Sequence, residues 1–218
     1  MKHPFSLENL FSFLNSQSIV LSDHQQNQFQ VYRELLKLWS GKQNLVSKMD
    51  VLHLVERHFL PSAHLSLSLP IQINGKLIDV GTGAGFPGIV LKILRPELSL
   101  TLLDSSHKKV LFLEEVCEQL ALDCPIICQR AEEYKPQASE KYLIVISRAV
   151  AKLDLLRRLS WHLIKPGGHI YALKGGDYQH EIDELDKNNL KVEVIVPDRE
   201  WLRISNYLNH KYIIILET

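Results

Sequence analysis

The sequence predicts an α/β fold, in which a seven-stranded, mostly parallel sheet follows a helical extension. Two patterns support this prediction. Seven short apolar segments occur between residues 76 and 216, and helical stretches separate most of them. Before residue 70, apolar side chains recur at helical spacing. With 218 residues, 45% of them hydrophobic, the chain can bury one substantial α/β core, so we expect a helical extension at 1–74 and the α/β domain at 75–218.

The helical extension contains start and stop signals. Ser22 and Asp23 supply an N-cap for a long helix, and Ser40 and Gly41 predict where that helix ends. Pro70 then separates the helices from the first strand.

The α/β region alternates between strand and helix patterns. We predict strands at 76–80, 98–103, 125–128, 142–146, 169–173, 191–196 and 211–216. We predict helices at 87–95, 107–121, 153–164 and 178–188. This alternation favours parallel strands covered by helices on both faces. No clear crossover helix lies between Pro197 and Asn209, so we expect the last two strands to be antiparallel.

Composition and charge exclude several classes of protein. The formal net charge is zero, so no overall basic field indicates a nucleic-acid partner, although residues 75–175 carry a small excess of basic side chains that permits a local RNA-facing surface. No apolar run approaches the roughly 20 residues of a membrane span, and we expect a cytoplasmic protein without a membrane partner. Cys117, Cys124 and Cys128 lack CxxC spacing, which argues against disulfides and against a bound metal.

A glycine-rich turn follows the first predicted strand. Residues 81–88 read Gly-Thr-Gly-Ala-Gly-Phe-Pro-Gly, so the backbone can adopt positive φ and approach a ligand closely. The segment fits two patterns at once. Gly81, Gly83 and Gly85 make the GxGxG of methyltransferases that use S-adenosyl-L-methionine, whereas Gly83, Gly85 and Gly88 make the GxGxxG of nicotinamide enzymes. The glycines alone do not choose between these cofactors.

Two acidic residues bear on the choice. Asp79 lies in the strand, where nicotinamide enzymes usually carry an apolar residue; it is a candidate contact at the methionine end of the cofactor, and a capping role in the turn is the alternative. Asp104 closes the second strand, where a carboxylate can accept both ribose hydroxyls of either cofactor. Only about 130 residues follow the turn, which leaves no separate substrate domain of the kind dehydrogenases carry.

We therefore predict a methyltransferase that uses S-adenosyl-L-methionine. An NAD(P)-dependent oxidoreductase and a cofactor-binding protein without turnover are the alternatives.

The fourth strand indicates which acceptor is methylated. A pyrimidine carbon needs a cysteine nucleophile near this strand, and none of the three cysteines falls there. An exocyclic amine needs Asn or Asp before two prolines, whereas the strand ends in Ile146-Ser147-Arg148-Ala149. A ring nitrogen such as guanine N7 needs neither, because its lone pair attacks the methyl carbon directly and no proton is lost. Positioning would then supply most of the catalysis.

Other side chains are candidates for ligand contact. Arg148, at the end of the fourth strand, could hold a cofactor carboxylate, a guanine edge or a phosphate, and a surface salt bridge is the alternative. Ala131 and Glu132 follow the third strand and could flank an adenine, and a solvated helix start is the alternative. Several basic side chains, among them Lys108, Lys109 and Lys174, are candidates for RNA phosphate contact, with simple solvation as the alternative.

The motifs together resemble those of one family. They are Asn44-Leu45, Arg57-His58, the turn at 79–88, Leu103-Asp104-Ser105, Lys108-Lys109, Phe112-Leu113, Ser147-Arg148-Ala149 and Ala172-Leu173-Lys174-Gly175. In this combination and order they are similar to the bacterial small-subunit ribosomal RNA methyltransferase G, also called glucose-inhibited division protein B. Two positions depart from the family pattern: Val46 stands where a Thr is usual, and Pro61 where an Asp is expected.

The resemblance implies a class I methyltransferase fold with a Rossmann-like sheet, and methylation of N7 of one guanine in 16S ribosomal RNA. The substrate would be 16S RNA or an assembling 30S particle, and we expect a monomer. Implied cofactor contacts are Gly81, Phe86, Ala131, Glu132 and Arg148, with Asp104 at the ribose end, and RNA contacts lie around Asn44, Arg57 and His58. The turn adds Asp79, Gly83 and Gly85 to the cofactor site, and we expect Arg148 to position the reacting groups.

Overall fold

The fold is built on one seven-stranded sheet, seen in a computed structural model that describes residues 5–43, 45–186 and 190–217. The strand order is β3-β2-β1-β4-β5-β7-β6. The strands span β1 Leu77–Val80, β2 Leu100–Asp104, β3 Ile126–Cys128, β4 Tyr142–Arg148, β5 Ile164–Gly175, β6 Lys191–Ile195 and β7 Lys211–Glu217. β1 to β5 pair in parallel, and β7 runs antiparallel to both β5 and β6. The predicted sheet and its antiparallel terminal pair are confirmed.

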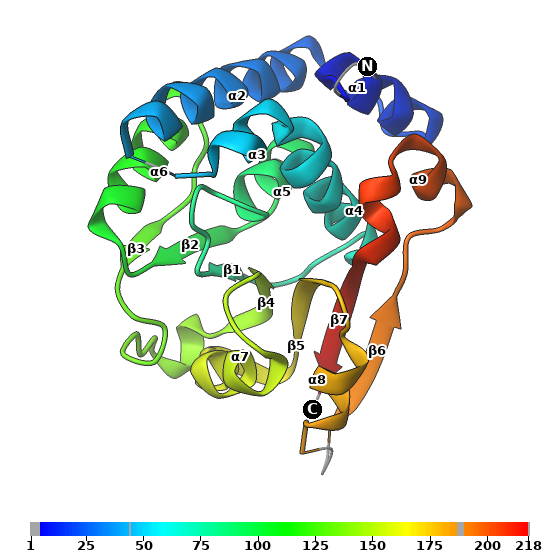
Figure 1. The fold of residues 1–218 in the computed structure, drawn as a ribbon. Coiled ribbons are helices and arrows are strands. Elements are labelled where there is room, and N and C mark those ends of the chain that lie inside the picture. The colour runs from blue at the N-terminus through cyan, green and yellow to red at the C-terminus, as the bar shows by residue number, and fades with distance from the viewer. Residues whose placement is uncertain (1–4, 44, 187–189, 218) are drawn as a thin grey trace.

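Helices cover both faces of this sheet (Figure 1), with α7 and α8 on one face and α2, α4, α5 and α6 on the other. The α-helices span α1 Leu7–Ser16, α2 Asp23–Gln43, α3 Lys48–Leu52, α4 Leu60–Ser68, α5 Gly88–Leu94, α6 His107–Gln119, α7 Leu153–Ser160, α8 Gln179–Asp183 and α9 Arg199–Ile204. A π-helical turn, η1, spans Val55–Phe59, and 3-10 turns lie at η2 Ala138–Glu140, η3 Trp161–Leu163 and η4 Asn206–His210. Among the residues described, every helix is too short or too polar to span a lipid bilayer.

Alternating strand residues divide the core between the two faces. Leu77 of β1 packs in the cluster formed with α2, α4, α5 and α6, whereas Ile78 packs in the cluster formed with α7 and α8. Because both faces of the sheet are covered, its central strands are apolar on both sides.

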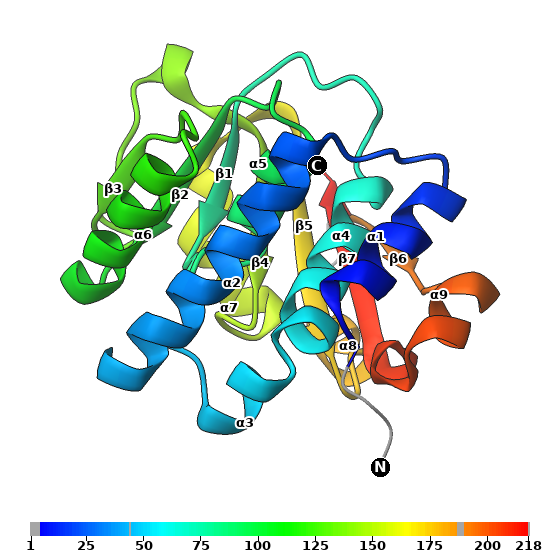
Figure 2. The same cartoon turned by 90° about the horizontal axis from the view of Figure 1, so that it is seen from above.

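The helical extension packs directly on the sheet-covering helices. Figure 2 shows α2 running between α6 and α4. The ring of Tyr32 in α2 stacks on Phe59 at a centroid distance of 5.4 Å, and both rings are fully buried. The extension therefore shares one continuous apolar core with β1, α5 and α6.

The predicted end of the first long helix is wrong. Ser22 does cap it, since the Ser22 Oγ accepts a hydrogen bond from the Gln25 N–H at 3.3 Å. The helix then continues through Gly41 to Gln43. One helical glycine costs only about 1 kcal/mol, so Gly41 does not by itself end a helix whose preceding turn is anchored by Trp39 against Phe112 of α6.

Two further predictions near the C-terminus are corrected. Of the helix predicted at 178–188, the described residues form helix only at Gln179–Asp183, and Ile182 and the following Leu185 are both buried without a longer helix; residues 187 and 188 lie outside the described residues. The connection between β6 and β7, expected to lack a helix, contains α9 and η4. Asp198 caps α9, and Trp201 packs against Phe13 of α1 at a centroid distance of 4.7 Å.

Candidate functional site

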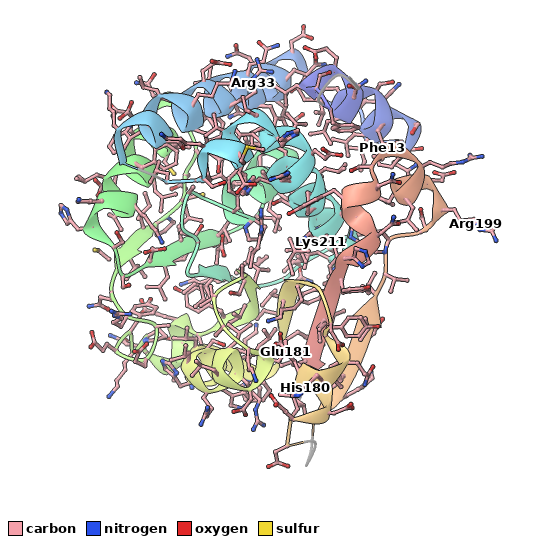
Figure 3. All side chains as sticks on the ribbon, in the orientation of Figure 1. Phe13, Arg33, His180, Glu181, Arg199 and Lys211 are labelled. Carbon is pink, nitrogen blue, oxygen red and sulfur yellow. The ribbon has the colours of Figure 1, made fainter. Side chains whose placement is uncertain are left out.

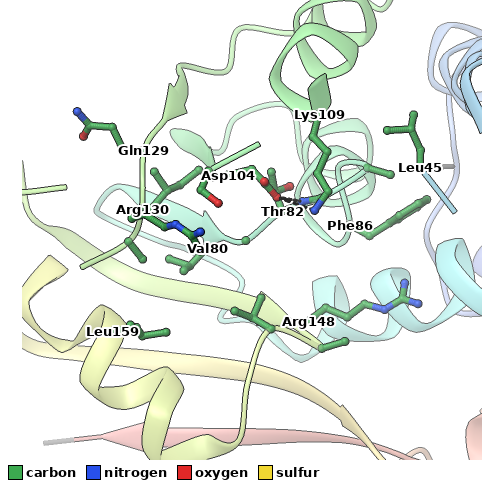
Figure 4. Close-up of a pocket in the computed structure, with 18 of the residues that line it drawn as sticks. Leu45, Val80, Thr82, Phe86, Asp104, Lys109, Gln129, Arg130, Arg148 and Leu159 are labelled. Carbon is green, nitrogen blue, oxygen red and sulfur yellow. Dashed lines mark hydrogen bonds and ion pairs between the residues drawn. The ribbon is translucent and has the colours of Figure 1, made fainter. Parts of the chain in front are cut away.

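A cavity of about 470 Å³ opens at the carboxyl ends of β1, β2 and β4 (Figure 4). The strand order reverses between β1 and β4, which is where open α/β sheets bind ligands. The lining residues come from the glycine turn, from the segments that follow β2, β3 and β4, and from the extension: 81–84, Phe86, 103–105, Lys109, 129–132, 148–150, Leu45, Val46 and His58 among them.

Asp79 stabilises the glycine turn through two hydrogen bonds. Its Oδ2 accepts hydrogen bonds from the Thr82 hydroxyl at 2.7 Å and the Gly88 N–H at 2.8 Å. The side chain is fully buried and does not line the cavity, and burial raises its pKa to about 7. The capping role that the sequence left open is therefore present in the structure, where this carboxylate ties β1 to the start of α5.

The three glycines of the turn face different surroundings, although all three have positive φ. A Cβ on Gly83 would meet no atom closer than 3.9 Å, and Gly83 lines the cavity. A Cβ on Gly85 would lie 2.6 Å from Ile89 and 2.8 Å from the Tyr32 hydroxyl, outside the cavity lining. Gly81 lines the cavity and approaches Val150 of the segment after β4. Spacing in the sequence does not distinguish these roles.

Asp104 joins the turn to the end of β2. Its Oδ2 accepts a hydrogen bond from the Gly83 N–H at 2.9 Å and lies 3.4 Å from the Lys109 ammonium (Figure 4). Its Oδ1 accepts from the Ser106 N–H at 2.9 Å. Ala131 and Glu132 line the same cavity after β3. Carboxylates thus concentrate at the β2–β3 side of the cavity, where the sequence predicted the ribose contact.

Arg148 lies at the end of β4, opposite Asp104 in Figure 4. Its Nη2 donates a hydrogen bond to the backbone carbonyl of Arg57 at 3.1 Å, and the guanidinium carbon lies 5.7 Å from the centroid of the Phe86 ring. Its Nη1 is buried and has no hydrogen-bond partner among the described residues. Burial lowers the pKa of Arg148, yet arginine ionises so readily that the group stays cationic. A surface salt bridge does not describe this residue.

His58 forms part of the cavity wall on the side of the extension. Its ring lies 4.8 Å from that of Phe86, and burial lowers its pKa to about 3. The imidazole is therefore neutral at physiological pH. Its neighbour Arg57 pairs with Asp50 at 2.8 Å. Asn44, predicted as an RNA contact, lies outside the described residues.

A second cavity of about 280 Å³ shares Arg148 and Ala149 with the first. It is lined by Arg57, Pro61, Lys174, Tyr207 and Lys211 among others. Lys174 does not present a free charge there, because its ammonium lies 2.8 Å from the Glu181 carboxylate. Lys108 is exposed on α6 and lines neither cavity.

Sequence reasoning missed Tyr207 and Lys211, which line the second cavity, and Tyr32, which supports the glycine turn. The Tyr32 hydroxyl donates a hydrogen bond of 2.6 Å to the Ala84 carbonyl in the turn, and the Lys211 ammonium lies 4.5 Å from the centroid of the Tyr207 ring. No local motif marks these residues, since their partners are distant in sequence or lie in an irregular connection. Within the described ranges, no three His, Cys, Asp or Glu side chains are grouped as metal ligands.

Known structures share this fold. A precorrin-6y C5,15-methyltransferase from Geobacter metallireducens aligns with a TM-score of 0.54 at 17% identity, covering 81% of this chain and 92% of its own. A SAM-dependent methyltransferase from Thiobacillus denitrificans, solved in complex with S-adenosyl-L-homocysteine, aligns with a TM-score of 0.54 at 12% identity, covering 79% and 98%. The predicted class I methyltransferase fold is therefore confirmed.

Sequence comparisons indicate the family. The model of the GidB family, described as rRNA small subunit methyltransferase G, matches residues 25–200. Proteins named ribosomal RNA small subunit methyltransferase G are similar to this chain: that of Clostridium kluyveri is 38% identical over 197 residues, covering 87% of this chain and 81% of its own. That of Staphylococcus epidermidis is 42% identical over 183 residues, covering 82% and 76%. The chain therefore belongs to the rRNA small subunit methyltransferase G family.

Proposed function

We propose that this protein transfers a methyl group from S-adenosyl-L-methionine to N7 of one guanine in 16S ribosomal RNA. One observation carries the proposal: in a chain of this family, the glycine turn, Asp104, Glu132 and Arg148 line a single cavity. No described feature favours a nicotinamide cofactor or a binding protein without turnover.

The polar groups of the cavity fit both ends of this cofactor. The Asp104 carboxylate is suited to accept the ribose hydroxyls, and the unpartnered Nη1 of Arg148 is suited to donate to the methionyl carboxylate. When bound, the cofactor supplies an electrophilic methyl carbon on a positively charged sulfur. The remaining proposed cofactor contacts are Gly81, Gly83, Phe86, Ala131 and Glu132, while Asp79 and Gly85 act by shaping the turn.

The chain's own residues position the acceptor base, and the cavity wall at His58 is uncharged. Guanine N7 attacks with its lone pair, so a general base is not required, and a positive charge remains on the base after transfer. Neutral His58 in the cavity wall adds no repulsion to that charge. We propose that Arg148 orients the reacting groups, since it lies between the two cavities.

We propose that the RNA approaches from the side of the extension. The residues assigned to this contact are Asn44, Arg57, His58, Lys108 and Lys109. Residues 1–74 would act as the helical extension and 75–218 as the methyltransferase domain, and their shared apolar core supports folding as one unit. The protein would act in the cytoplasm as a monomer, on 16S RNA or an assembling 30S particle.

A methylation assay tests the proposal. Purified protein and S-adenosyl-L-methionine are incubated with 30S particles from a host strain that lacks its own family member, and the RNA is digested for mass spectrometry. We expect N7-methylguanosine to increase in 16S RNA, and Arg148→Met to abolish the increase. Arg158→Met is the matched control, because Arg158 is exposed on α7 and pairs with Asp154. Methylation of another atom, or none by the folded parent protein, would contradict the proposal.

A thermal-shift titration tests the cofactor separately. A ligand that binds the folded state raises the unfolding temperature. We expect S-adenosyl-L-homocysteine to raise it and NAD(P) to leave it unchanged, and the reverse result would favour the oxidoreductase.

A further inference from the structure

The loop between β4 and α7, residues 149–152, begins where the two cavities meet. Ala149 lines both cavities and Val150 lines the larger one. Ala149 has a φ of +54°, a left-handed conformation that costs a residue with a Cβ about 1–2 kcal/mol. Such a conformation persists only where the surroundings hold it.

The loop also touches the glycine turn. A Cβ on Gly81 would lie 2.5 Å from Cγ2 of Val150, so the Val150 side chain packs closely against the backbone of the turn. A displacement of the loop would therefore change both the cofactor cavity and the second cavity.

Lys174 and Glu181 hold the C-terminal part of this loop, where it enters α7. The Lys174 ammonium donates a hydrogen bond to the Ala151 carbonyl at 2.8 Å. The Glu181 Oε2 accepts one from the Leu153 N–H at 2.8 Å, at the first residue of α7. The same Oε2 lies 2.8 Å from the Lys174 ammonium, and the two side chains are only 10% and 17% exposed. Figure 3 shows Glu181 on α8, beside the yellow α7 segment.

We propose that Lys174 and Glu181 are positioning residues for the methyl transfer, which fix the loop so that Ala149 and Val150 keep their places in the cavity walls. This inference rests on the function proposed above. It replaces the phosphate contact expected for Lys174, because this side chain is only 10% exposed and its ammonium already contacts Glu181 and the Ala151 carbonyl, whereas the Lys109 side chain is 40% exposed. Glu181 also accepts a hydrogen bond from one of the N–H groups that a helix N-terminus leaves without a partner. The N-cap residue of α7, Lys152, makes no such bond with its own side chain.

The chain offers a matched control pair. Lys152 and Glu184 lie 3.1 Å apart and also join this loop to α8, but their side chains are 66% and 43% exposed. Exposed ion pairs of this kind contribute little to stability. Removing them changes the same charges without touching the backbone hydrogen bonds of the loop.

The experiment compares Lys174→Met, Glu181→Met and the double variant with Lys152→Met and Glu184→Met. Single-turnover methylation of unmethylated 30S particles is measured at saturating S-adenosyl-L-methionine, with circular dichroism to establish that each variant is folded. We expect each pair variant to lose roughly 10- to 100-fold in rate, as misplaced reacting groups do. We expect the double variant to be no slower than the worse single variant, since the two residues act as one unit. The control variants should stay within twofold of the parent.

Two further readouts separate positioning from RNA contact. A lysine that neutralises a phosphate contributes roughly 0.7–0.9 to the slope of log affinity against log salt concentration. We expect this slope, measured for 30S binding, to be unchanged in Lys174→Met. A reduced slope in Lys174→Met, together with a normal methylation rate in Glu181→Met, would overturn the proposal. Hydrogen exchange at the Leu153 amide needs no activity, and it should accelerate in both pair variants. Unchanged exchange at Leu153 in both pair variants would overturn the proposal, whether or not the parent protein methylates RNA. A parent protein that fails to methylate would count against the proposed function alone.

Discussion

Alanine substitution at three glycines tests how the structure separates their roles. All three have positive φ: Gly83 at +62°, Gly85 at +91° and Gly167 at +74°. Gly83 and Gly85 lie two residues apart in the turn, whereas Gly167 lies in the β5 segment and has no atom within 4 Å of a Cβ position. Gly167→Ala therefore measures the cost of the backbone conformation alone.

The expected magnitudes follow from the space around each Cβ. Gly167→Ala and Gly83→Ala should each lower the free energy of unfolding by about 1–2 kcal/mol, the cost of a left-handed alanine. Gly85→Ala adds contacts of 2.6 Å with Ile89 and 2.8 Å with the Tyr32 hydroxyl. Overpacking typically costs about 1–3 kcal/mol more, so we expect a total loss of roughly 2–5 kcal/mol.

Urea denaturation and calorimetric titration with S-adenosyl-L-homocysteine measure the two effects. Gly83→Ala places a methyl group in the cavity, and we expect at least about a tenfold loss of affinity, or 1.4 kcal/mol. Gly167→Ala should bind like the parent. The steric reasoning is refuted if Gly85→Ala is as stable as Gly167→Ala, and the placement of the cofactor is refuted if Gly83→Ala binds as tightly as Gly167→Ala.

Three further predictions concern buried polar groups. Because the folded state raises the pKa of Asp79 from 3.8 to about 7, it holds a proton that the unfolded chain releases. The free energy of unfolding of the parent, relative to Asp79→Asn, should therefore fall as pH rises through that window, by at most about 1.4 kcal/mol per pH unit in urea titrations. Burial lowers the pKa of His64 from 6.5 to about 4, so here stability changes with pH in the opposite direction. The parent should lose stability relative to His64→Asn as pH falls from 6.5 to 4. An equal pH slope in the two proteins would contradict this prediction. Tyr32→Phe leaves the Ala84 carbonyl without its hydrogen-bond partner. We expect the free energy of unfolding to fall by about 1–3 kcal/mol and S-adenosyl-L-homocysteine to bind more weakly. If neither value changes, α2 and the turn are not linked in this way.

The sheet was predictable because its evidence lies in contiguous residues. Alternating apolar runs and helical stretches predicted the seven strands. The antiparallel pairing of β7 was also predicted correctly, although the connection before it contains α9 and η4. Predictions failed where a local signal was weak or a tertiary contact decided the outcome. The helix α2 runs through Gly41, because one helical glycine costs only about 1 kcal/mol, and Trp201 stabilises α9 by packing on α1.

The candidate site was predictable in its membership more than in its geometry. The sequence placed Asp104, Glu132 and Arg148 at strand ends, and the structure brings these three to one cavity because parallel strands end at the same edge of a sheet. It could not reveal that Tyr32 reaches the turn from 52 residues away. Such a contact leaves no periodic signal in either segment.

By itself, the sequence determined the fold class, the glycine turn and the family, since each depends on residue types at short, fixed spacings. Only the tertiary structure decided that Gly83 faces the cavity while Gly85 packs against Tyr32, that Asp79 lies beneath the turn, and that Lys174 pairs with Glu181. The physical reason is that the direction of a Cβ bond and the partner of a charge depend on backbone dihedrals and on packing between distant elements.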